Sequence, residues 1–209
     1  MIKKISKQKE MLLENHLDKL YNSKNPLIKF IHVNRLNLIV KTIPDKERLK
    51  ILDAGCGEGH LIEKLNYKNN NNLYYGIDII QIFLQKAKER CPYATFKIMD
   101  LSKINFDDEF FDIIICTEVL EHIIKYKIVI EELKRVLKKD GYLIITFPNE
   151  TLWMISRFLL RRKHIKIHVN SFTPNKIKSL VKMKLISQVN LPFKLPPFIS
   201  LGCLMKFKK

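Results

Sequence analysis

The sequence is short of clustered cysteine and of long apolar runs, and each shortage excludes a class of protein. No CxxC pair occurs, which argues against a zinc site, an iron–sulfur cluster and a disulfide framework. No apolar run approaches the roughly 20 residues of a membrane-spanning helix, and the N-terminus lacks the pattern of a signal peptide. These shortages predict a cytoplasmic protein without a metal site. The four cysteines are Cys56, Cys91, Cys116 and Cys203.

Acidic side chains are absent from the C-terminal part of the chain. Residues 151–209 carry 13 basic side chains and no acidic one, whereas residues 51–150 carry 13 basic and 16 acidic ones. Residues 1–50 are basic again, with 12 basic and 5 acidic side chains, and the net charge is +17. A general bias toward lysine does not by itself explain why residues 151–209 contain no acidic side chain. The distribution therefore favours an anionic partner: a membrane surface, a nucleic acid or an acidic substrate.

The hydrophobic pattern divides the chain into an N-terminal helical extension, residues 1–48, and a domain, residues 49–209. In the extension, Asn25-Pro26 predicts a helix start and Pro44 the end of that helix. From residue 49, short apolar runs alternate with helical segments, the last of which is predicted over 126–139. This alternation predicts a doubly wound α/β fold with a parallel sheet, followed by an antiparallel pair of C-terminal strands.

Three glycines crowd the segment ILDAGCGEGHLIEKL, between a predicted strand and a predicted helix. A helix start presents unpaired N–H groups at the positive end of the helix dipole, and glycine lets a ligand approach that backbone. Open parallel sheets bind nucleotides in this way, at the carboxyl ends of their strands. The segment is not the dinucleotide fingerprint GxGxxG, because His60 stands at the third glycine position, and no P-loop GK[ST] follows.

Three carboxylates accompany the predicted strand ends. Asp53 precedes the first glycine, Asp78 follows Gly57 by 21 residues, and Asp100 ends the third predicted strand. A carboxylate inside the glycine turn repels a pyrophosphate and attracts an ammonium, and one at the second position accepts hydrogen bonds from ribose hydroxyls. The third carboxylate is placed to meet an adenine amino group. Together they fit a cofactor with adenosine and an amino acid but no phosphate, such as S-adenosylmethionine.

At these residues the sequence resembles class I S-adenosylmethionine-dependent methyltransferases, broadly including those of quinone biosynthesis. The matching segments are LDAGCGEG, GIDI, IMD, FDIIICTEVLEHI and LKRVLKKDGYLIITFPN, in that order, and the resemblance covers about residues 28–209. It implies a seven-stranded, mostly parallel sheet whose last strand is antiparallel. It also implies S-adenosyl-L-methionine as the cofactor. The contacts implied by motif are Asp53, Gly55 and Gly57 with the methionine end, Asp78 with the ribose, Ile79, Asp100 and Leu101 with the adenine, Thr117 with the methionine moiety, and Arg35, beside His32, with the cofactor carboxylate.

Other polar residues of this region have both catalytic and structural interpretations. His122, in EVLEH, is the candidate general base, because an imidazole titrates near neutral pH; the alternative is local packing. Glu118 and Glu121 are interpreted as structural. Cys56 is predicted to be a small buried side chain rather than a nucleophile, and Asp100 has the alternative role of capping the following turn.

The acceptor is predicted from the segment 150–172, which stands where relatives have a lid. It is basic and apolar, and Arg157 and Arg161 share one helical face, a pattern typical of a membrane-surface helix; the alternative is an ordinary lid over a small substrate. We expect O-methylation of a small, lipid-like acceptor, at an anionic membrane face. Many nucleic-acid amino-methylases have an Asn/Asp-Pro-Pro-aromatic motif where this chain has CTEV, so a nucleic-acid partner is less favoured. An RNA methyltransferase and a non-catalytic cofactor-binding scaffold stay open, and no oligomeric state is predicted.

Overall fold

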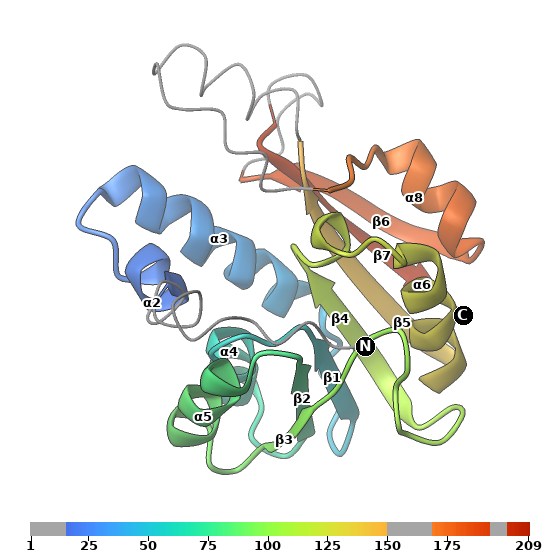
Figure 1. The fold of residues 1–209 in the computed structure, drawn as a ribbon, viewed down its shortest axis with the longest axis horizontal. Helices are drawn as coiled ribbons and strands as arrows, with labels where there is room; N and C mark the ends of the chain where they lie inside the picture. The colour runs from blue at the N-terminus through green and yellow to red at the C-terminus, as the bar shows by residue number, and fades with distance from the viewer. Residues whose placement is uncertain (1–15, 150–168, 193–199) are drawn as a thin grey trace.

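The computed structural model describes residues 16–149, 169–192 and 200–209 (Figure 1). The predicted lid, 150–172, and its arginines therefore lie almost wholly outside the described residues. None of the described helices offers an apolar stretch that could cross a bilayer. In chain order the elements are α2 (His16–Tyr21), α3 (Pro26–Thr42), β1 (Lys50–Ala54), α4 (His60–Lys68), β2 (Leu73–Asp78), α5 (Gln81–Arg90), β3 (Thr95–Ile98), β4 (Phe111–Thr117), η1 (Leu120–His122), α6 (Tyr126–Val136), β5 (Leu137–Pro148), α8 (Pro174–Val181), β6 (Lys184–Leu191) and β7 (Gly202–Lys208).

The sheet has seven strands in the order β3-β2-β1-β4-β5-β7-β6. Strands β1 to β5 pair in parallel, and β7 pairs antiparallel with both β5 and β6. The predicted doubly wound sheet with an antiparallel last strand is therefore confirmed. Strand order reverses between β1 and β4, and in open α/β sheets a ligand binds outside the carboxyl ends of the strands at such a switch point.

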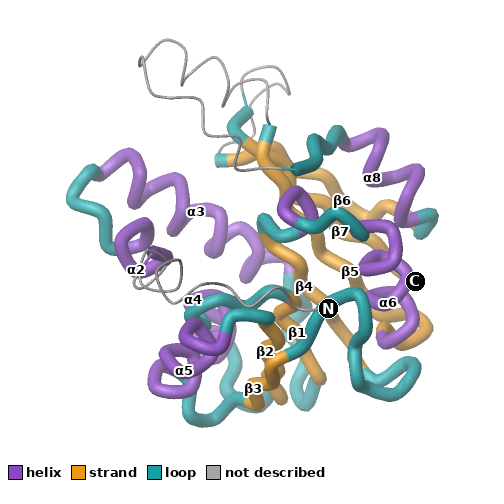
Figure 2. Tube along the Cα trace, in the orientation of Figure 1, coloured by secondary structure: helices purple, strands orange, loops and turns teal. Residues whose placement is uncertain are grey.

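Helices cover both faces of this sheet (Figure 2). On one face α3, α4 and α5 bury apolar side chains such as Ile39 and Ile62 against the sheet. On the other face α6 and α8 do the same with side chains such as Leu133 and Ile177. Strand β4 supplies both cores, because its side chains alternate between the faces and both faces are covered.

Helix α3 begins as the sequence predicts. The Oδ1 atom of Asn25 accepts hydrogen bonds from the N–H groups of Leu27 and Ile28, and Pro26 occupies the first turn. Leu36 and Ile39 of this helix are buried in the same core as β1 and α4. The helix is thereby packed against the edge of the site-bearing part of the sheet.

The prediction of a helix over 126–139 is wrong at its C-terminal end. Helix α6 ends at Val136, and Leu137 already belongs to β5, where it pairs with Phe111 of β4. The local pattern fits a longer helix equally well. Burial of Leu137 in the core and its pairing with Phe111 decide the extended backbone, an example of tertiary structure overriding local propensity.

Candidate functional site: the cofactor cleft at the strand ends

The turn between β1 and α4 requires its glycines. Gly55, Gly57 and Gly59 have φ values of 83°, 51° and 82°, in the left-handed region that other residues avoid. A Cβ atom on Gly55 would lie 2.5 Å from Cγ2 of Val119. The N–H of Gly55 also donates to the carbonyl of Ile77 at 2.8 Å, which ties the turn to the end of β2.

Asp78 holds this glycine turn in place. One of its carboxylate oxygens accepts a hydrogen bond from the N–H of Gly57 and the other from the N–H of Ile80, both at 2.9 Å. Burial raises the pKa of the Asp78 carboxyl, although these N–H groups oppose the shift. The residue predicted to bind the ribose therefore also shapes the turn beside it, and each oxygen retains a lone pair for a ligand.

Asp53 is the most perturbed acid of the site. It is buried, and burial together with the nearby Asp78 carboxylate raises its pKa to about 8. No hydrogen bond or ion pair within the described residues compensates its charge. A buried carboxylate beside a second, partly buried one is costly unless a cation compensates them. The pair therefore has the electrostatic character of a site for a positively charged ligand.

Arg35, on α3, lies at the carboxyl end of β4, where it pairs with Glu118. Its Nη1 lies 3.2 Å from Oε2 of Glu118, and its Nη2 lies 3.3 Å from Nδ1 of His32. Burial alone would lower the pKa of Arg35, but Glu118 and the hydrogen-bonded Tyr21 raise it. The guanidinium is thus a fixed, charged group placed by three side chains.

Glu118 and Tyr21 are the members of this arrangement that sequence reasoning missed. Glu118 was interpreted as structural, but it directly follows β4 with a φ of 53°, a strained conformation of the kind that clusters at functional sites. Its Oε1 accepts a hydrogen bond from the Thr146 hydroxyl at 3.4 Å. Nothing in the local pattern around Tyr21 indicates that it would reach Arg35.

Two buried polar atoms of the cleft have no hydrogen-bond partner among the residues that the structure describes. They are the Nε of Arg35 and the hydroxyl of Thr117. Such atoms are uncommon in folded proteins and call for an explanation. An amino-acid carboxylate near Arg35, with an ammonium or sulfonium near Asp53, would compensate these groups. The residues present therefore fit the amino-acid end of S-adenosylmethionine.

The adenine end is less closely determined. Ile79 leaves 42% of its side chain exposed, which suits packing against a flat ring. Asp100 is exposed, and its Oδ1 accepts hydrogen bonds from the N–H and hydroxyl of Ser102, both at 2.8 Å, so it does cap the following turn. Leu101 packs in the core, which leaves its main chain for a ligand. Contact of these three residues with adenine stays a prediction.

His122 lies in the 3-10 turn η1 and is exposed. The neighbouring Glu121 is buried, and its carbonyl accepts hydrogen bonds from the N–H groups of Val169 and Asn170. Turn η1 is thus hydrogen-bonded to residues 169 and 170, which precede α8. Catalysis by His122 stays a prediction. Cys56 is buried, as predicted, and burial raises the pKa of its thiol.

A charged cluster attaches α2 to the glycine turn. Asp18 accepts from Nη2 of Arg90 at 2.6 Å and lies 3.0 Å from Nε2 of His60. The buried Glu58 accepts from the N–H of Asp18 at 2.9 Å and pairs with Lys86 at 3.6 Å. Asp18, Glu58 and His60 stand close enough to share a metal ion. Because Arg90 and Lys86 already compensate the two carboxylates, we assign the cluster to fastening α2.

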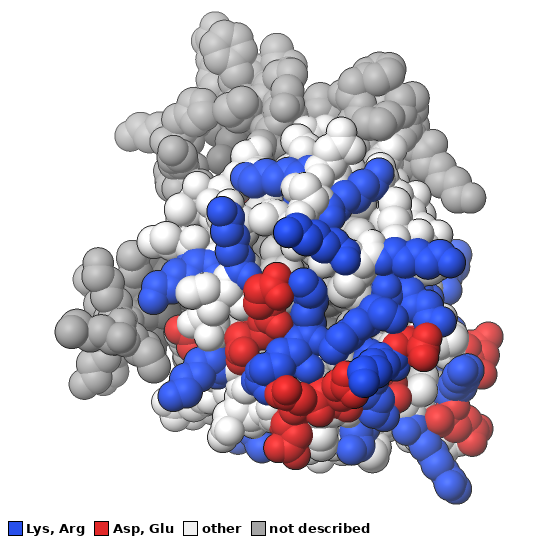
Figure 3. All heavy atoms as spheres, turned by 90° about the vertical axis from the view of Figure 1, so that its right-hand side faces the viewer, with Lys and Arg blue, Asp and Glu red and all other residues white. Residues whose placement is uncertain are grey.

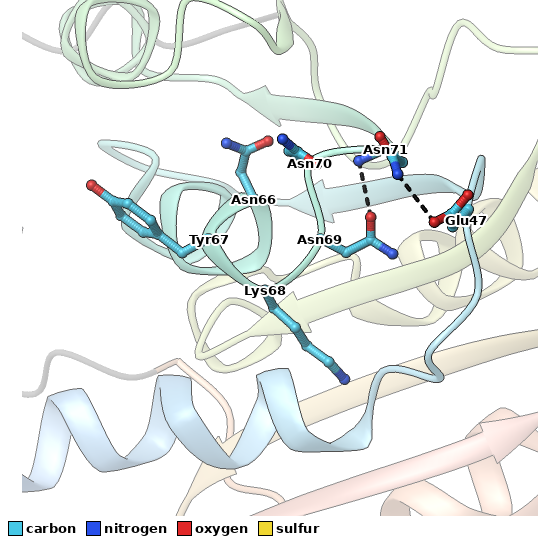
Figure 4. Close-up of a pocket in the computed structure, with 7 residues that line it drawn as sticks. All are labelled: Glu47, Asn66, Tyr67, Lys68, Asn69, Asn70 and Asn71. Atoms are coloured by element: carbon cyan, nitrogen blue, oxygen red, sulfur yellow. Dashed lines mark hydrogen bonds between the residues drawn. The ribbon is translucent and has the colours of Figure 1, made fainter.

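A second hollow lies away from this cleft (Figure 4). It is formed by Glu47 and residues 66–71, which precede β1 and β2. The hollow is therefore at the amino ends of the strands, opposite to the glycine turn. Its side chains bond to one another; for example, Nδ2 of Asn71 donates to Oε1 of Glu47 at 3.1 Å. We assign no function to it.

Comparison with known proteins agrees with this geometry. A family model described as a methyltransferase domain matches residues 45–187. The chain is 28% identical over 159 residues to a malonyl-[acyl-carrier protein] O-methyltransferase of Bacillus cytotoxicus, covering 71% of this chain and 55% of that one. It is 32% identical over 136 residues to the mitochondrial ubiquinone biosynthesis O-methyltransferase of Bos taurus, covering 59% and 36%. The chain thus spans about half the length, or less, of these curated relatives.

The fold is shared with solved structures as well. The magnesium protoporphyrin IX methyltransferase of Synechocystis, solved with bound SAH, superposes with a TM-score of 0.77 at 18% identity, covering 96% of this chain and 95% of that one. At this identity the likeness concerns the fold. The family match covers more than half of the chain and includes the glycine turn, Asp78 and the end of β4. The chain therefore belongs to the family of S-adenosylmethionine-dependent methyltransferase domains.

Proposed function

We propose that this protein transfers the methyl group of S-adenosylmethionine to an oxygen atom of a small, lipid-like acceptor. The observation that carries the cofactor half of the proposal is the pair of neighbouring carboxylates, the buried Asp53 and the half-buried Asp78, beside a glycine turn. When bound, the cofactor supplies a methyl group carried on a positively charged sulfur. An uncompensated negative site suits that charge better than it suits a nucleotide phosphate.

The chain's own residues divide the work of binding. Asp53 attracts the ammonium, Arg35 the carboxylate, and Asp78 the ribose hydroxyls, while Gly55 and Gly57 leave the backbone open. Because the cofactor is already activated, the protein chiefly has to align the acceptor. Alignment alone contributes roughly 7–11 kcal/mol in well-oriented reactions. A phenol or carboxylate acceptor needs only modest help from a base.

The acceptor class is supported by two features of the chain. The curated relatives reported above are named as O-methyltransferases of ubiquinone biosynthesis and of a malonyl carrier protein. The residues at the end of β4 and just after it, Thr117-Glu118-Val119, do not form the Asn/Asp-Pro-Pro-aromatic motif of nucleic-acid amino-methylases. A hydroxyl acceptor loses a proton on methylation, and His122, immediately beyond this segment, is the candidate base.

The test is a methyl-transfer assay with labelled cofactor. The purified chain is incubated with S-adenosylmethionine labelled in the methyl group and with a cell extract, and the label is followed into lipid, small-molecule, RNA and protein fractions. We expect label in the lipid or small-molecule fraction, bound to an oxygen atom of the product. The Asp53→Asn variant is the control, because it should lose transfer while remaining folded.

Two other results would replace the proposal. Label in RNA, with binding that weakens steeply as salt rises, would indicate an RNA methyltransferase. Cofactor binding by calorimetry without transfer to any fraction would indicate a non-catalytic scaffold.

A further inference from the structure

Three segments that are distant in the sequence meet at one corner of the molecule. Nδ2 of Asn170 donates to the carbonyl of Ile123 at 2.8 Å, which joins residues 169–172 to the turn before α6. The amine of Lys176, in the first turn of α8, lies 4.8 Å from the ring centroid of Phe172 and 5.5 Å from that of Tyr126. The start of α6, the segment 169–172 and the start of α8 therefore form one continuous surface.

This corner exposes aliphatic side chains. Ile124 is 79% exposed, Val169 56% and Ile128 49%. Ile124 lies in the turn that leads into α6, and Ile128 lies in the first turn of that helix. Single exposed apolar residues are ordinary, but here three of them share a surface that hydrogen bonds hold together.

The same corner is cationic. Lys125 and Lys127 flank the exposed isoleucines, Lys178 is an exposed residue of α8, and Lys182 is the exposed C-cap that ends this helix. All four are exposed, and none has an ion pair with an acidic side chain in the described part of the chain. We call this set, with Ile124, Ile128 and Val169, the α6–α8 corner.

Two other described lysines have acidic partners. Lys208 pairs with Asp140 at 2.9 Å, and Lys134 with Glu131 at 3.1 Å. In Figure 3 the acidic side chains gather in the lower part of this face, while the upper part carries Lys and Arg without neighbouring acids. The uncompensated charge is thus concentrated toward α8.

We propose that the α6–α8 corner docks the protein on an anionic lipid surface. Lysines attracted to acidic headgroups, around aliphatic side chains that enter the interface, are the combination by which surface proteins bind such membranes. Single-stranded nucleic acid would instead be met by exposed aromatic rings on which bases stack, and Tyr126 and Phe172 pack against each other and are not exposed.

The location of the corner connects it with the site. Turn η1 follows β4 closely and leads to Ile124. Hydrogen bonds from Ser102 chiefly lower the pKa of Asp100, at the predicted adenine end, and the positive charge of Lys125 adds to this shift. A lipid-like acceptor leaving the membrane at this corner would enter close to the carboxyl ends of the strands. This step rests on the proposed function; docking itself does not require catalysis.

The test is sedimentation of the full chain with vesicles of phosphatidylcholine alone or mixed with phosphatidylglycerol. We expect binding only to the mixed vesicles. Reversing three charges, in Lys127→Glu/Lys178→Glu/Lys182→Glu, should lower the partition coefficient at least about tenfold, because each lysine near an anionic surface contributes roughly a fivefold factor. The matched control, Lys41→Glu/Lys46→Glu/Lys88→Glu, changes the net charge equally with three exposed lysines of α3, α5 and the loop before β1.

Ile124→Ser/Ile128→Ser provides a second, uncharged arm, and should also weaken binding to the mixed vesicles. Equal losses in the corner and control charge variants would overturn the proposal, because binding would then follow net charge alone. So would unchanged binding of the isoleucine variant combined with displacement of the protein from vesicles by RNA. Calorimetric binding of S-adenosylhomocysteine is measured for every variant. If the wild-type chain binds S-adenosylhomocysteine but not the mixed vesicles, only the docking proposal is refuted. If it binds neither, the proposed function is refuted as well.

Discussion

Replacing Asp53 by asparagine should stabilise the empty protein and impair cofactor binding, and both effects should depend on pH. In the folded protein the pKa of Asp53 is about 8, against 3.8 for the exposed group. The folded state therefore binds the proton more tightly than the unfolded chain does. Stability falls as pH rises from about 4 to about 8, because ionisation becomes progressively more costly in the folded state than in the unfolded one.

The magnitude follows from the size of the shift. One pKa unit corresponds to about 1.4 kcal/mol, so the fully developed penalty reaches up to ~6 kcal/mol above pH 8. Asparagine keeps the shape and removes the penalty. We expect Asp53→Asn to exceed the wild type in free energy of unfolding by about 1–2 kcal/mol near pH 5 and by up to ~6 kcal/mol near pH 8.5.

Urea unfolding at the two pH values measures the first effect, with Asp107→Asn, at an exposed loop position, as the matched control. A stability gain that is the same at both pH values would refute the reasoning. Calorimetry measures the second effect. Near neutral pH the wild type should release close to one proton on binding S-adenosylhomocysteine, because the ligand's ammonium favours the ionised Asp53. The variant should release none and bind at least tenfold more weakly.

Three further predictions concern the glycine turn, the Arg35–Glu118 ion pair and the attachment of α2. Gly55→Ala should destabilise the fold by about 2–4 kcal/mol through its φ of 83° and the contact with Val119, and adding Val119→Ala should restore only part of the loss in urea unfolding. Glu118→Gln should lower the affinity for S-adenosylhomocysteine about tenfold, because glutamine no longer fixes the guanidinium of Arg35. The affinity for 5′-methylthioadenosine, which lacks the amino-acid end, should be unchanged. Equal losses of affinity for both ligands would contradict this role. Arg90→Met should release α2, seen as faster proteolysis near residue 21 with stability changed by about 1 kcal/mol or less.

The comparison of sequence and structure separates two kinds of residue in the cleft. Asp53, the glycines and Asp78 are recognisable from their order along the chain, because each belongs to a strand end or to the turn that follows it. Parallel strands bring their carboxyl ends to one edge, so once the alternation is identified the convergence of these residues follows. The antiparallel direction of the last strand was expected from the two consecutive C-terminal strands and from the family resemblance, whereas the order of the strands in the sheet comes from the structure.

Other features depend on contacts between distant segments. Glu118 meets Arg35 across 83 positions of the chain, and Tyr21 reaches the same guanidinium from α2. The end of α6 is set by the pairing of Leu137 with Phe111. No local pattern encodes such contacts, because the same residues fit a longer helix or a structural acid equally well.

The sequence by itself determined the alternation of strands and helices, the glycine turn and the family of the chain. These features follow from short-range periodicity and from backbone conformations that only glycine adopts readily. The tertiary structure alone decided which charges are buried, which are compensated and which stay exposed: the raised pKa of Asp53, the Arg35–Glu118 pair and the uncompensated lysines of the α6–α8 corner. The physical reason is that electrostatic energies depend on distance and on burial, and both are properties of the packed chain.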